Sequence, residues 1–519
     1  MPSFGALSVL PPVLAIVAAI ASRRAIPGLF VGIWTGAIIF TGSHGLGQTF
    51  EWIVVSIATE FHVSILVFIF LLGGGVGLLW VLGGSYALTR WASSRLENRR
   101  QAGVATWLLG VLVFFNDYAN TAIVGTAMQD VTDSADISRE KLSYVVDSTA
   151  APVSTFLISD WIAFQLSMIQ QGYEAAGIAG SAPSTFVVFL GSIPYNFYCL
   201  LAIAMVGIVV LTGRDYGEML TAERRASSTG KVLRDGAQPL QSVEADLGEP
   251  RTDKPMLRVF VVPIVMLVAI TLLGAYWTGR AGGDIIGILG EANWALSLVW
   301  GGAGMVGVAG YFGIRHRILT FGETVSTFVD GTKVMMTAAT ILALAWSLGT
   351  VTTELGTGEY VTSIAQGFVS PELLFVIVLI ASAFIAFTTG TSWGTMAIVT
   401  PIAIPLAVNV AGTGALSPVV GAIFSGAIFG DHCSPISDTT VLSATFSGAD
   451  LIDHVRTQIY YAVTVVVVAI ALFLIYGYLA ITPFVLAPLG AVVLIGLVYG
   501  LSALDEGHRT GPSQPSDAD

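Results

Sequence analysis

The sequence is poor in charge and in cysteine, and each shortage argues against a class of protein. Only 11% of its 519 residues are charged, whereas 54% are apolar. The two cysteines, Cys199 and Cys433, lie in apolar surroundings without C-x-x-C spacing, which disfavours a disulfide framework or a thiol metal site. No basic stripe is present that could bind nucleic acid.

Long apolar runs, by contrast, recur along the whole chain. A helix that crosses a bilayer core of about 30 Å needs roughly 20 apolar residues, and many runs reach this length. The first run, residues 6–23, has no basic stretch before it and no small-residue cleavage site after it, so we expect a retained span. The sequence therefore predicts an all-α polytopic membrane protein.

The distribution of Lys and Arg predicts which loops face the cytoplasm, because cytoplasmic loops are enriched in these residues. The basic clusters, expected inside, are residues 23–24, 90–100, 213–256 and 315–317, and the loops without Lys or Arg, expected outside, are 43–62, 167–183 and 351–371.

Two apolar segments do not fit this alternation unless each enters and leaves by the same face. They are 103–128, interrupted by "FNDYAN", and 372–411, interrupted by "TTGTSWGT". With both segments as re-entrant hairpins, we expect about 11 transmembrane helices, an external N-terminus and a cytoplasmic C-terminus.

The two halves of the chain also resemble each other at these interruptions. "NDYANTAIV" (116–124) matches "TSWGTMAIV" (391–399), and "DSTAAPVS" (147–154) resembles "DHCSPISD" (431–438) with Pro152 opposite Pro435. The hairpins enter from opposite sides, which predicts two inverted-topology repeats with discontinuous helices at a midplane site.

These patterns predict an order of segments along the chain. They are an N-terminal span at 1–23; a first repeat at 24–212 with a hairpin at about 103–128 and a broken helix at about 143–166; a cytoplasmic linker at 213–256; a connecting span at 257–278; a second repeat at 291–480 with a hairpin at about 372–411 and a broken helix at about 418–447; a C-terminal span at 482–503; and a disordered acidic tail at 504–519.

Polar side chains at these breaks are the candidate functional residues. A carboxylate in hydrocarbon is costly and usually faces a functional cavity, and a proline in a helix frees carbonyl oxygens that can bind a small hard cation. A proton and Na⁺ can compete for such a carboxylate near neutral pH. The candidate cation and proton ligands are Asp147, Asp431, Asp438, Asp117, Asn116, Thr391, Ser392, Ser434 and Ser437, with Na⁺ expected at Asp147 and Asp431 and helix breaks at Pro152 and Pro435.

Structural interpretations stand beside these functional ones. Asp147 and Asp431 could be structural caps at the helix breaks, and the hairpin tips could be capped by Thr391, Ser392, Asn116 and Asn120. Asp160 could lie at the membrane interface, and His432 is more typical of a hydrogen-bonded structural histidine than of a metal ligand. "GGGVG" at 73–77 is more typical of close helix packing than of phosphate binding. "GTSWG" at 390–394 has the pattern of a serine hydrolase elbow, although that elbow requires a strand before it.

These motifs resemble those of the NhaC-type Na⁺/H⁺ antiporter family, within the wider ion transporter superfamily. The resemblance rests on "FNDYANTAIVG", "ISREKLSYVVDSTAAPVSTFLISDW", "GTSWGTMAIVTP" and "GDHCSPISDTT". It implies two inverted repeats with re-entrant hairpins and exchange of Na⁺ for H⁺. Relatives with similar motifs exchange malate for lactate or carry amino acids, and the chain departs from the family pattern at Asn116, where an acid is common, and Asp160, where Ser or Thr is usual.

We therefore expect a secondary antiporter in the cell membrane that exchanges Na⁺ for H⁺, not an enzyme. The alternatives are a cation-coupled exchanger of small organic anions or amino acids, a passive cation channel and, distantly, an intramembrane serine hydrolase. No cofactor is expected besides the transported Na⁺ and H⁺. The expected surroundings are the lipid bilayer, with a homodimer as a candidate assembly and no nucleic acid.

The predicted orientation can be tested with single introduced cysteines. A cysteine at position 235 should react with an impermeant maleimide only after the membrane is opened, whereas one within residues 351–371 should react in intact cells. Labelling of position 235 from outside would contradict both the orientation and the inverted repeat.

Overall fold

The computed structural model describes residues 4–509 except 23–24, 94, 97, 115–116, 157–160, 179, 181, 240–250, 253–255, 284–286, 289–290, 358–359 and 361–368. All regular elements in this part of the chain are helices. Among the described residues, eight helices are long and apolar enough to cross a membrane, or up to nine if a bent helix pair counts as one span. The protein is therefore all-helical and polytopic.

The long helices include spans on both sides of the charged central loop. They are α4 (Glu60–Val81), α12 (Phe197–Thr212), α15 (Leu257–Gly279), α17 (Trp294–Arg315), α22 (Ser392–Ala411), α23 (Leu416–Cys433), α25 (Leu451–Leu479) and α26 (Pro483–Arg509). The bent pair is α2 (Ala25–Thr41) and α3 (Leu46–Ile57), whose axes differ by 116°. The predicted first span starts as the 3-10 helix η1 (Gly5–Val9) and continues as α1 (Leu10–Ser22), which alone has 13 residues.

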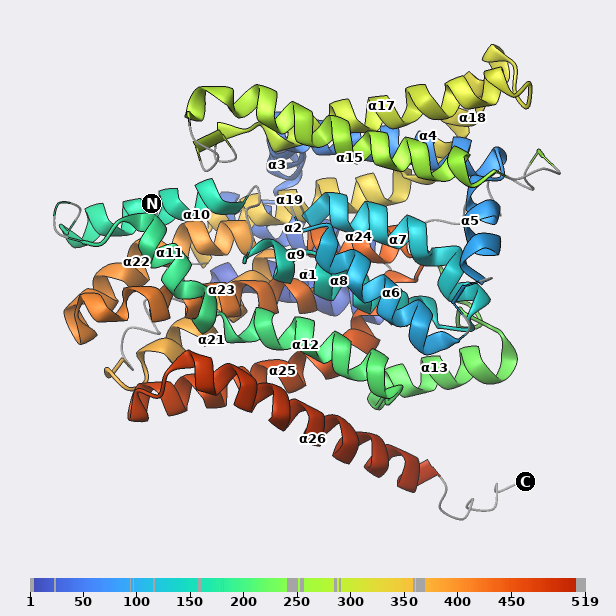
Figure 1. Cartoon of the computed structure of the whole chain (residues 1–519). Coiled ribbons are helices and arrows are strands. Elements are labelled where there is room, and N and C mark those ends of the chain that lie inside the picture. The colour runs from blue at the N-terminus through green and yellow to red at the C-terminus, as the bar shows by residue number, and fades with distance from the viewer. Residues whose placement is uncertain are drawn as a thin grey trace, which may run out of the picture.

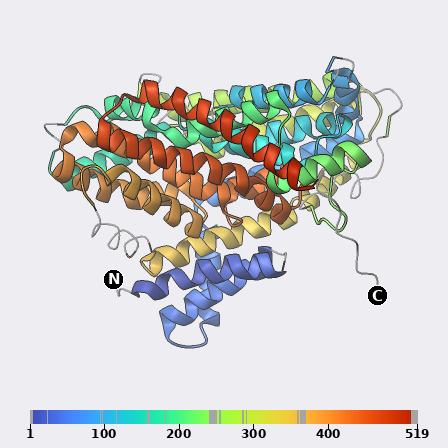
Figure 2. The same cartoon turned by 90° about the horizontal axis from the view of Figure 1, so that it is seen from below.

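The helices are arranged in layers (Figure 1). Helices α4, α15, α17 and α18 (Phe321–Val334) form one outer layer, and α25 and α26 lie on the opposite side. Seen from below, α1, α2 and α3 form a group next to α19 (Met336–Glu354), which packs against α2 and α3 (Figure 2). The shorter helices lie between these layers.

Helices end at the polar interruptions in both halves of the chain. The first hairpin segment consists of α6 (Arg99–Leu112) and α7 (Asp117–Ser134), and the second of α21 (Leu374–Thr389) and α22. The helices that follow are α8 (Arg139–Thr149), α9 (Ala151–Ser154) and α10 (Trp161–Ala176) in the first half, and α23 and α24 (Asp438–Phe446) in the second. Shorter elements, α5 (Gly84–Ser93) and α11 (Thr185–Ser192), complete the first half.

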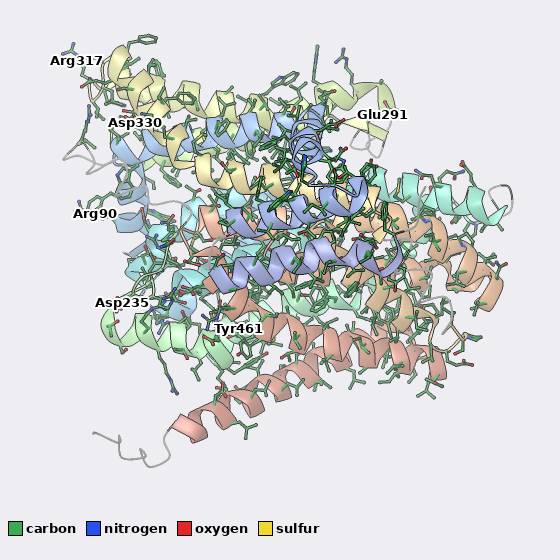
Figure 3. The ribbon with its side chains drawn as sticks, turned by 180° about the vertical axis from the view of Figure 1, so that it is seen from behind. Arg90, Asp235, Glu291, Arg317, Asp330 and Tyr461 are labelled. Carbon is green, nitrogen blue, oxygen red and sulfur yellow. The ribbon has the colours of Figure 1, made fainter. Side chains whose placement is uncertain are left out.

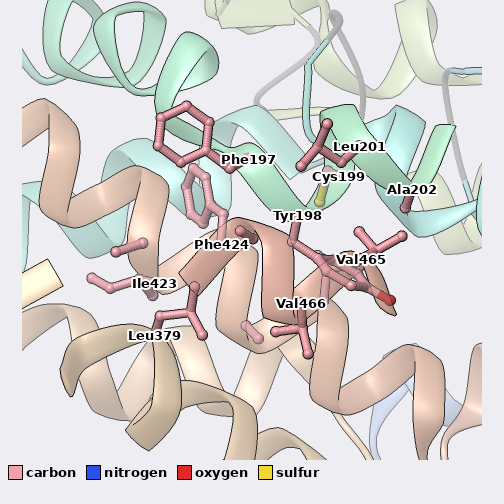
Figure 4. Packing of buried hydrophobic residues seen from close by; sticks show 14 of the residues in the cluster. Phe197, Tyr198, Cys199, Leu201, Ala202, Leu379, Ile423, Phe424, Val465 and Val466 are labelled. Carbon is pink, nitrogen blue, oxygen red and sulfur yellow. The ribbon is translucent and has the colours of Figure 1, made fainter. Parts of the chain in front are cut away.

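Apolar packing places α12 against α23 and α25 (Figure 4). Phe197 of α12 lies beside Phe424 of α23, and its ring centroid is 4.8 Å from that of Phe473 on α25. Tyr198 faces the same cluster but turns its hydroxyl toward the polar interior, as described below. This packing holds the broken helix α23 in place.

The charged loop at 213–256 was expected to be a solvated connector, and its first part is not. It forms α13 (Gly217–Thr229), whose Met219 is fully buried. Glu223 accepts a hydrogen bond from Arg99 at 2.7 Å, and Arg225 pairs with Glu140 at 2.8 Å. Charge-bearing residues therefore dock this helix on the bundle, which a hydropathy pattern does not detect.

Beyond α13, the same loop is tied to the start of α25. Arg234 Nε donates to the Asp453 carboxylate at 2.9 Å. This hydrogen bond raises the pKa of the Arg234 guanidinium, so the residue is charged at any physiological pH. The loop is thus anchored at both α8 and α25.

The glycines at 73–77 serve close helix packing, as the sequence indicated. Gly73 and Gly74 on α4 face α18, where the backbone carbonyl of Gly73 approaches Gly331 so closely that a Cβ at position 331 would lie 2.4 Å from it. Positions 73, 74 and 331 therefore have no room for a Cβ. The structure confirms this part of the sequence interpretation.

Gly331→Ala should destabilise the protein, because the new methyl group would push α4 and α18 apart; overpacking of this kind costs about 1–3 kcal/mol. Gly322→Ala is the matched control on the same helix, since a Cβ there meets no described atom within 4 Å. Melting temperatures of the purified proteins would measure both. Equal melting temperatures would show that the contact carries no stability.

Candidate functional site

The second hairpin tip contacts the break between α23 and α24. Ser434 Oγ donates to the carbonyl oxygen of Phe387 at 2.8 Å. Gly390, which ends α21 with a φ of 68°, lies against the backbone of Ile436, whose carbonyl oxygen would be 2.6 Å from a Cβ at position 390. The turn between α21 and α22 therefore packs directly against the break between α23 and α24.

The first half shows the same kind of contact, made by one amide. Asn120 Nδ2 on α7 lies 2.6 Å from the carbonyl oxygen of Gly110, 2.9 Å from that of Val113 and 3.0 Å from that of Thr149. These carbonyls lie near or at the ends of α6 and α8, where helical partners are missing. The expectation that Asn120 caps helix ends is confirmed.

Asp431 lies in the last turn of α23 and is 1% exposed. Its Oδ1 accepts a hydrogen bond from Ser437 Oγ at 2.6 Å, whereas its Oδ2 is buried without a hydrogen-bond partner among the described residues. Ser392, the first residue of α22, and Asp438, the first of α24, lie beside this carboxylate. A buried anionic oxygen without a donor is expensive unless it binds a cation or a proton.

Asp438 and Asp117 both begin helices, where the helix dipole favours negative charge. Tyr118 Oη donates to Asp438 Oδ2 at 2.5 Å, while the other oxygen of Asp438 accepts from the backbone N–H of Thr439 at 2.9 Å. Asp117 Oδ1 accepts from the backbone N–H of Tyr118 at 3.0 Å. Asp117, Asp431 and Asp438 all interact electrostatically with Tyr118, and these three carboxylates are here called the acidic group.

Asp147 on α8 has a very different environment. Its Oδ2 accepts from Gln458 Nε2 at 2.6 Å and lies 3.3 Å from His454 Nε2, and its Oδ1 accepts from Ser443 Oγ at 3.1 Å. Thr440 Oγ1 lies 3.3 Å both from Asp147 Oδ2 and from the carbonyl oxygen of Asp431. Asp147 is therefore surrounded by donors, and Thr440 links it to the acidic group.

His432, in the last turn of α23, lies close to Asp147. Its Nδ1 lies 2.7 Å from the Tyr198 hydroxyl and its Nε2 3.0 Å from the Ser148 hydroxyl, with Asp147 Oδ2 at 3.9 Å from the same nitrogen. Both ring nitrogens are thus taken by residues other than Ser392. The geometry does not pair Ser392 with a histidine base, which argues against the hydrolase alternative.

Several predicted ligands act as helix caps. The side chains of Thr391 and Ser437 accept from the backbone N–H groups of Gly394 and Thr440, at 3.3 and 3.5 Å, and begin α22 and α24. Pro152 lies in α9, directly after the end of α8, and Pro435 lies between α23 and α24. Asn116 and Asp160 lie outside the described residues.

Sequence reasoning missed His454 and Gln458, which contact Asp147 from α25. Both are fully buried and lie four residues apart, on one face of a helix that is otherwise largely apolar. The spacing of four residues is the one feature of the sequence that could have indicated these two residues. It becomes informative only when the face of α25 that points inward is known.

Among the described residues, no group of three or more His, Cys, Asp and Glu side chains is arranged to hold a metal ion. A cation would therefore have to use hydroxyl and carbonyl oxygens together with one or two carboxylates. Such mixed oxygen sets suit hard cations.

Buried carboxylates at helix breaks inside an apolar bundle are the features of an ion-coupled membrane transporter. A sequence profile of the Na⁺/H⁺ antiporter family matches residues 153–478, more than half of the chain. An uncharacterized protein of Haemophilus influenzae is 34% identical over 474 residues, 88% of each chain. The chain belongs to the NhaC-type Na⁺/H⁺ antiporter family, and the resemblance of its motifs is confirmed.

Two further relatives match a smaller part of the chain. The malate-2H⁺/Na⁺-lactate antiporter of Bacillus subtilis is 33% identical over 176 residues, 33% of this chain and 36% of the relative. The Na⁺/H⁺ antiporter NhaC of Alkalihalophilus pseudofirmus is 31% identical over 173 residues, again 33% of this chain and 36% of the relative.

Gly390→Ala should strongly reduce transport, because the new Cβ would push the hairpin tip away from Ile436 and the acidic group. Gly213→Ala is the matched control: Gly213 also ends a helix in the left-handed region, with a φ of 65° and a ψ of 21°, but a Cβ there meets no described atom within 4 Å. Both variants carry the backbone strain of about 1 kcal/mol for a non-glycine residue at positive φ. Transport and melting temperature should be measured together; equal loss in both variants would assign the effect to strain alone.

Proposed function

We propose that the protein is a secondary antiporter that exchanges Na⁺ for H⁺, with the acidic group as the cation site. The observation that carries this proposal is the Oδ2 atom of Asp431, a buried carboxylate oxygen without a hydrogen-bond donor among the described residues. Asp438 and the hydroxyl of Ser392 interact with the Asp431 carboxylate and would supply further oxygen ligands, while Asp117 would add negative charge nearby. Ser434 and Ser437 would support it from the break between α23 and α24.

Repulsion between neighbouring carboxylates supplies the coupling. Asp431 is buried and Asp438 beside it is half-buried, so two negative charges at this place are costly. Protonation of one carboxylate relieves this repulsion, and so does a bound Na⁺. The proton and Na⁺ therefore occupy the site in turn. Exchange follows when the site opens to each side in turn.

Asp147 is better suited to hold a proton than to bind Na⁺. The N–H groups of Gln458 and, in one tautomer, His454 point at its carboxylate, and a cation would have to displace them. Our proposal therefore shifts the sodium ligand from Asp147 to the acidic group. Asp147, with His454 beside it, then becomes the second proton-binding group, linked to the first through Thr440.

The predicted topology remains part of this proposal: about 11 spans, two re-entrant hairpins and two inverted repeats. The order of elements supports it, because α6–α7 and α21–α22 each precede a helix that breaks near a proline. Figure 3 supports a common cytoplasmic end, since Arg90, Asp235 and Arg317 lie at one end of the protein and Glu291 toward the other. The N-terminus would then be outside and the C-terminus in the cytoplasm.

An exchanger of small organic anions or amino acids is the second candidate. Gln458 Oε1 and His454 Nδ1 are buried without hydrogen-bond partners among the described residues, so the Asp147 centre has capacity for another polar ligand. A relative named as a malate and lactate antiporter adds to this. Malate, lactate and amino acids should therefore be included as competitors in every transport assay.

Asp431→Asn should abolish sodium-dependent proton movement in proteoliposomes while the protein remains folded, because an amide keeps the shape but cannot exchange a proton for a cation. Asp147→Asn should also stop exchange, yet leave binding of ²²Na⁺ to the purified protein largely intact. In the wild type, protons should compete with Na⁺ for the same carboxylates. If one proton competes with one Na⁺, the apparent sodium affinity should weaken by about tenfold for each unit by which the pH is lowered.

Detergent stability has to be measured beside these activities, since lost protein would imitate lost function. Thr445→Val is a suitable control, because this buried hydroxyl on α24 bonds only to its own helix, at the carbonyl of Val441. Retained exchange in a folded Asp431→Asn variant would overturn the assignment. Sodium affinity that stays constant across neutral pH would overturn the shared site.

A further inference from the structure

A cavity of about 480 Å³ lies apart from the carboxylate centres, between α6, α8, α12 and α13. It is formed where the charged helix α13 docks on the bundle, at the end of the protein that carries Asp235 (Figure 3). Its volume falls within the range of small-molecule sites. The proposed exchange reaction uses none of the residues that line it.

The charges that line the cavity are unbalanced toward positive. Four lining residues are basic, Arg99, Arg100, Lys141 and Arg224, and two are acidic, Asp215 and Glu223. Both acids are already neutralised within the protein. Lys141 and the Tyr461 hydroxyl both bond to Asp215, and Arg99 and the backbone N–H of Ser138 bond to Glu223 at 2.7 and 2.8 Å.

Arg100 is the cation that remains. It is exposed in the first turn of α6, lines the cavity, and is paired with no carboxylate among the described residues. Arg224 reaches the cavity from α13 on the other side. Two guanidinium groups at one opening can bind a phosphate through several charge-assisted hydrogen bonds.

The remaining wall of the cavity is apolar. Leu142 and Val145 contribute from α8, Val210 and Leu211 from α12, and Leu220 from α13. Leu211, which lines the cavity, is 41% exposed. The cavity therefore combines a basic rim with an apolar wall that continues onto an exposed apolar surface.

We propose that this cavity binds the phosphate headgroup of an anionic phospholipid, with Arg100 and Arg224 on the phosphate and an acyl chain along Leu211. Basic pockets between membrane helices are typical sites for such headgroups. A free phosphate ion would use the same two arginines, but it would gain nothing from the apolar wall. The wall is the reason to favour the lipid.

Occupancy of the cavity should affect transport, because α8 belongs to both sites. Lys141, Leu142 and Val145 line the cavity, and Asp147 follows two residues later on the same helix. A lipid that fixes the start of α8 would also fix the position of Asp147. The expected effect of the lipid is therefore on stability and on exchange rate together.

The test uses the full chain in neutral detergent, titrated with phosphatidylglycerol or with phosphatidylcholine. Phosphatidylglycerol should raise the melting temperature of the wild type by a few degrees, and phosphatidylcholine should not. Arg100→Gln combined with Arg224→Gln should weaken the apparent affinity by about tenfold or more, since each basic residue near an anionic headgroup contributes about 1 kcal/mol. The single variant Arg100→Gln changes an exposed residue that has no carboxylate partner among the described residues. It should therefore fold, and it tests the site even if the double variant misfolds.

The matched control is Arg90→Gln combined with Arg315→Gln, two exposed arginines outside the cavity. This control should respond to phosphatidylglycerol as the wild type does. If the control lost its response to phosphatidylglycerol to the same extent, general surface charge would explain the effect, and the proposed site would be wrong. An equal stabilisation by inorganic phosphate at constant ionic strength would also overturn the lipid proposal, in favour of a free-anion site.

Discussion

The structure depends on one constraint: a polar group inside an apolar bundle must find its partner within the protein. Each helix break exposes backbone groups that α-helical bonding no longer satisfies. The helix breaks pack against one another, so that side chains from one segment bond to the backbone groups of another. Asn120 donates to carbonyls near the ends of α6 and α8, and Ser434 donates to the carbonyl of Phe387 near the end of α21. The position of the buried carboxylates follows from these contacts.

Two kinds of carboxylate environment result. Asp438 and Asp117 start helices, so backbone dipoles stabilise their charge, and Asp438 also accepts hydrogen bonds from Tyr118 and from the N–H of Thr439. Asp431 receives one hydroxyl and keeps one free oxygen, whereas Asp147 receives an amide, a hydroxyl and an imidazole contact. Thr440 bonds to both centres, one rich in acceptors and one rich in donors. This contrast is the reason for proposing that the first binds the cation and the second the proton.

The sequence allowed the helical class, the family and the polar interruptions to be predicted, because carboxylates and prolines in apolar runs are rare and conspicuous. It did not reveal His454 and Gln458, since either residue could equally have faced solvent at the start of α25. It also missed α13, whose attachment depends on ion pairs such as Arg99 with Glu223 and not on apolar period. Long-range pairing of charges has no local signature in a sequence.

The Asn120 amide has only two hydrogens but lies within bonding distance of three carbonyl oxygens, so at least one hydrogen is shared. Gly110 and Val113 lie at the end of α6, and Thr149 is the last residue of α8. Separating any of these segments would strand a polar group in a dry interior. In the proposed exchange cycle, the turn between α6 and α7 and the end of α8 should therefore move as one rigid body, and relative movement must occur at surfaces that Asn120 does not join.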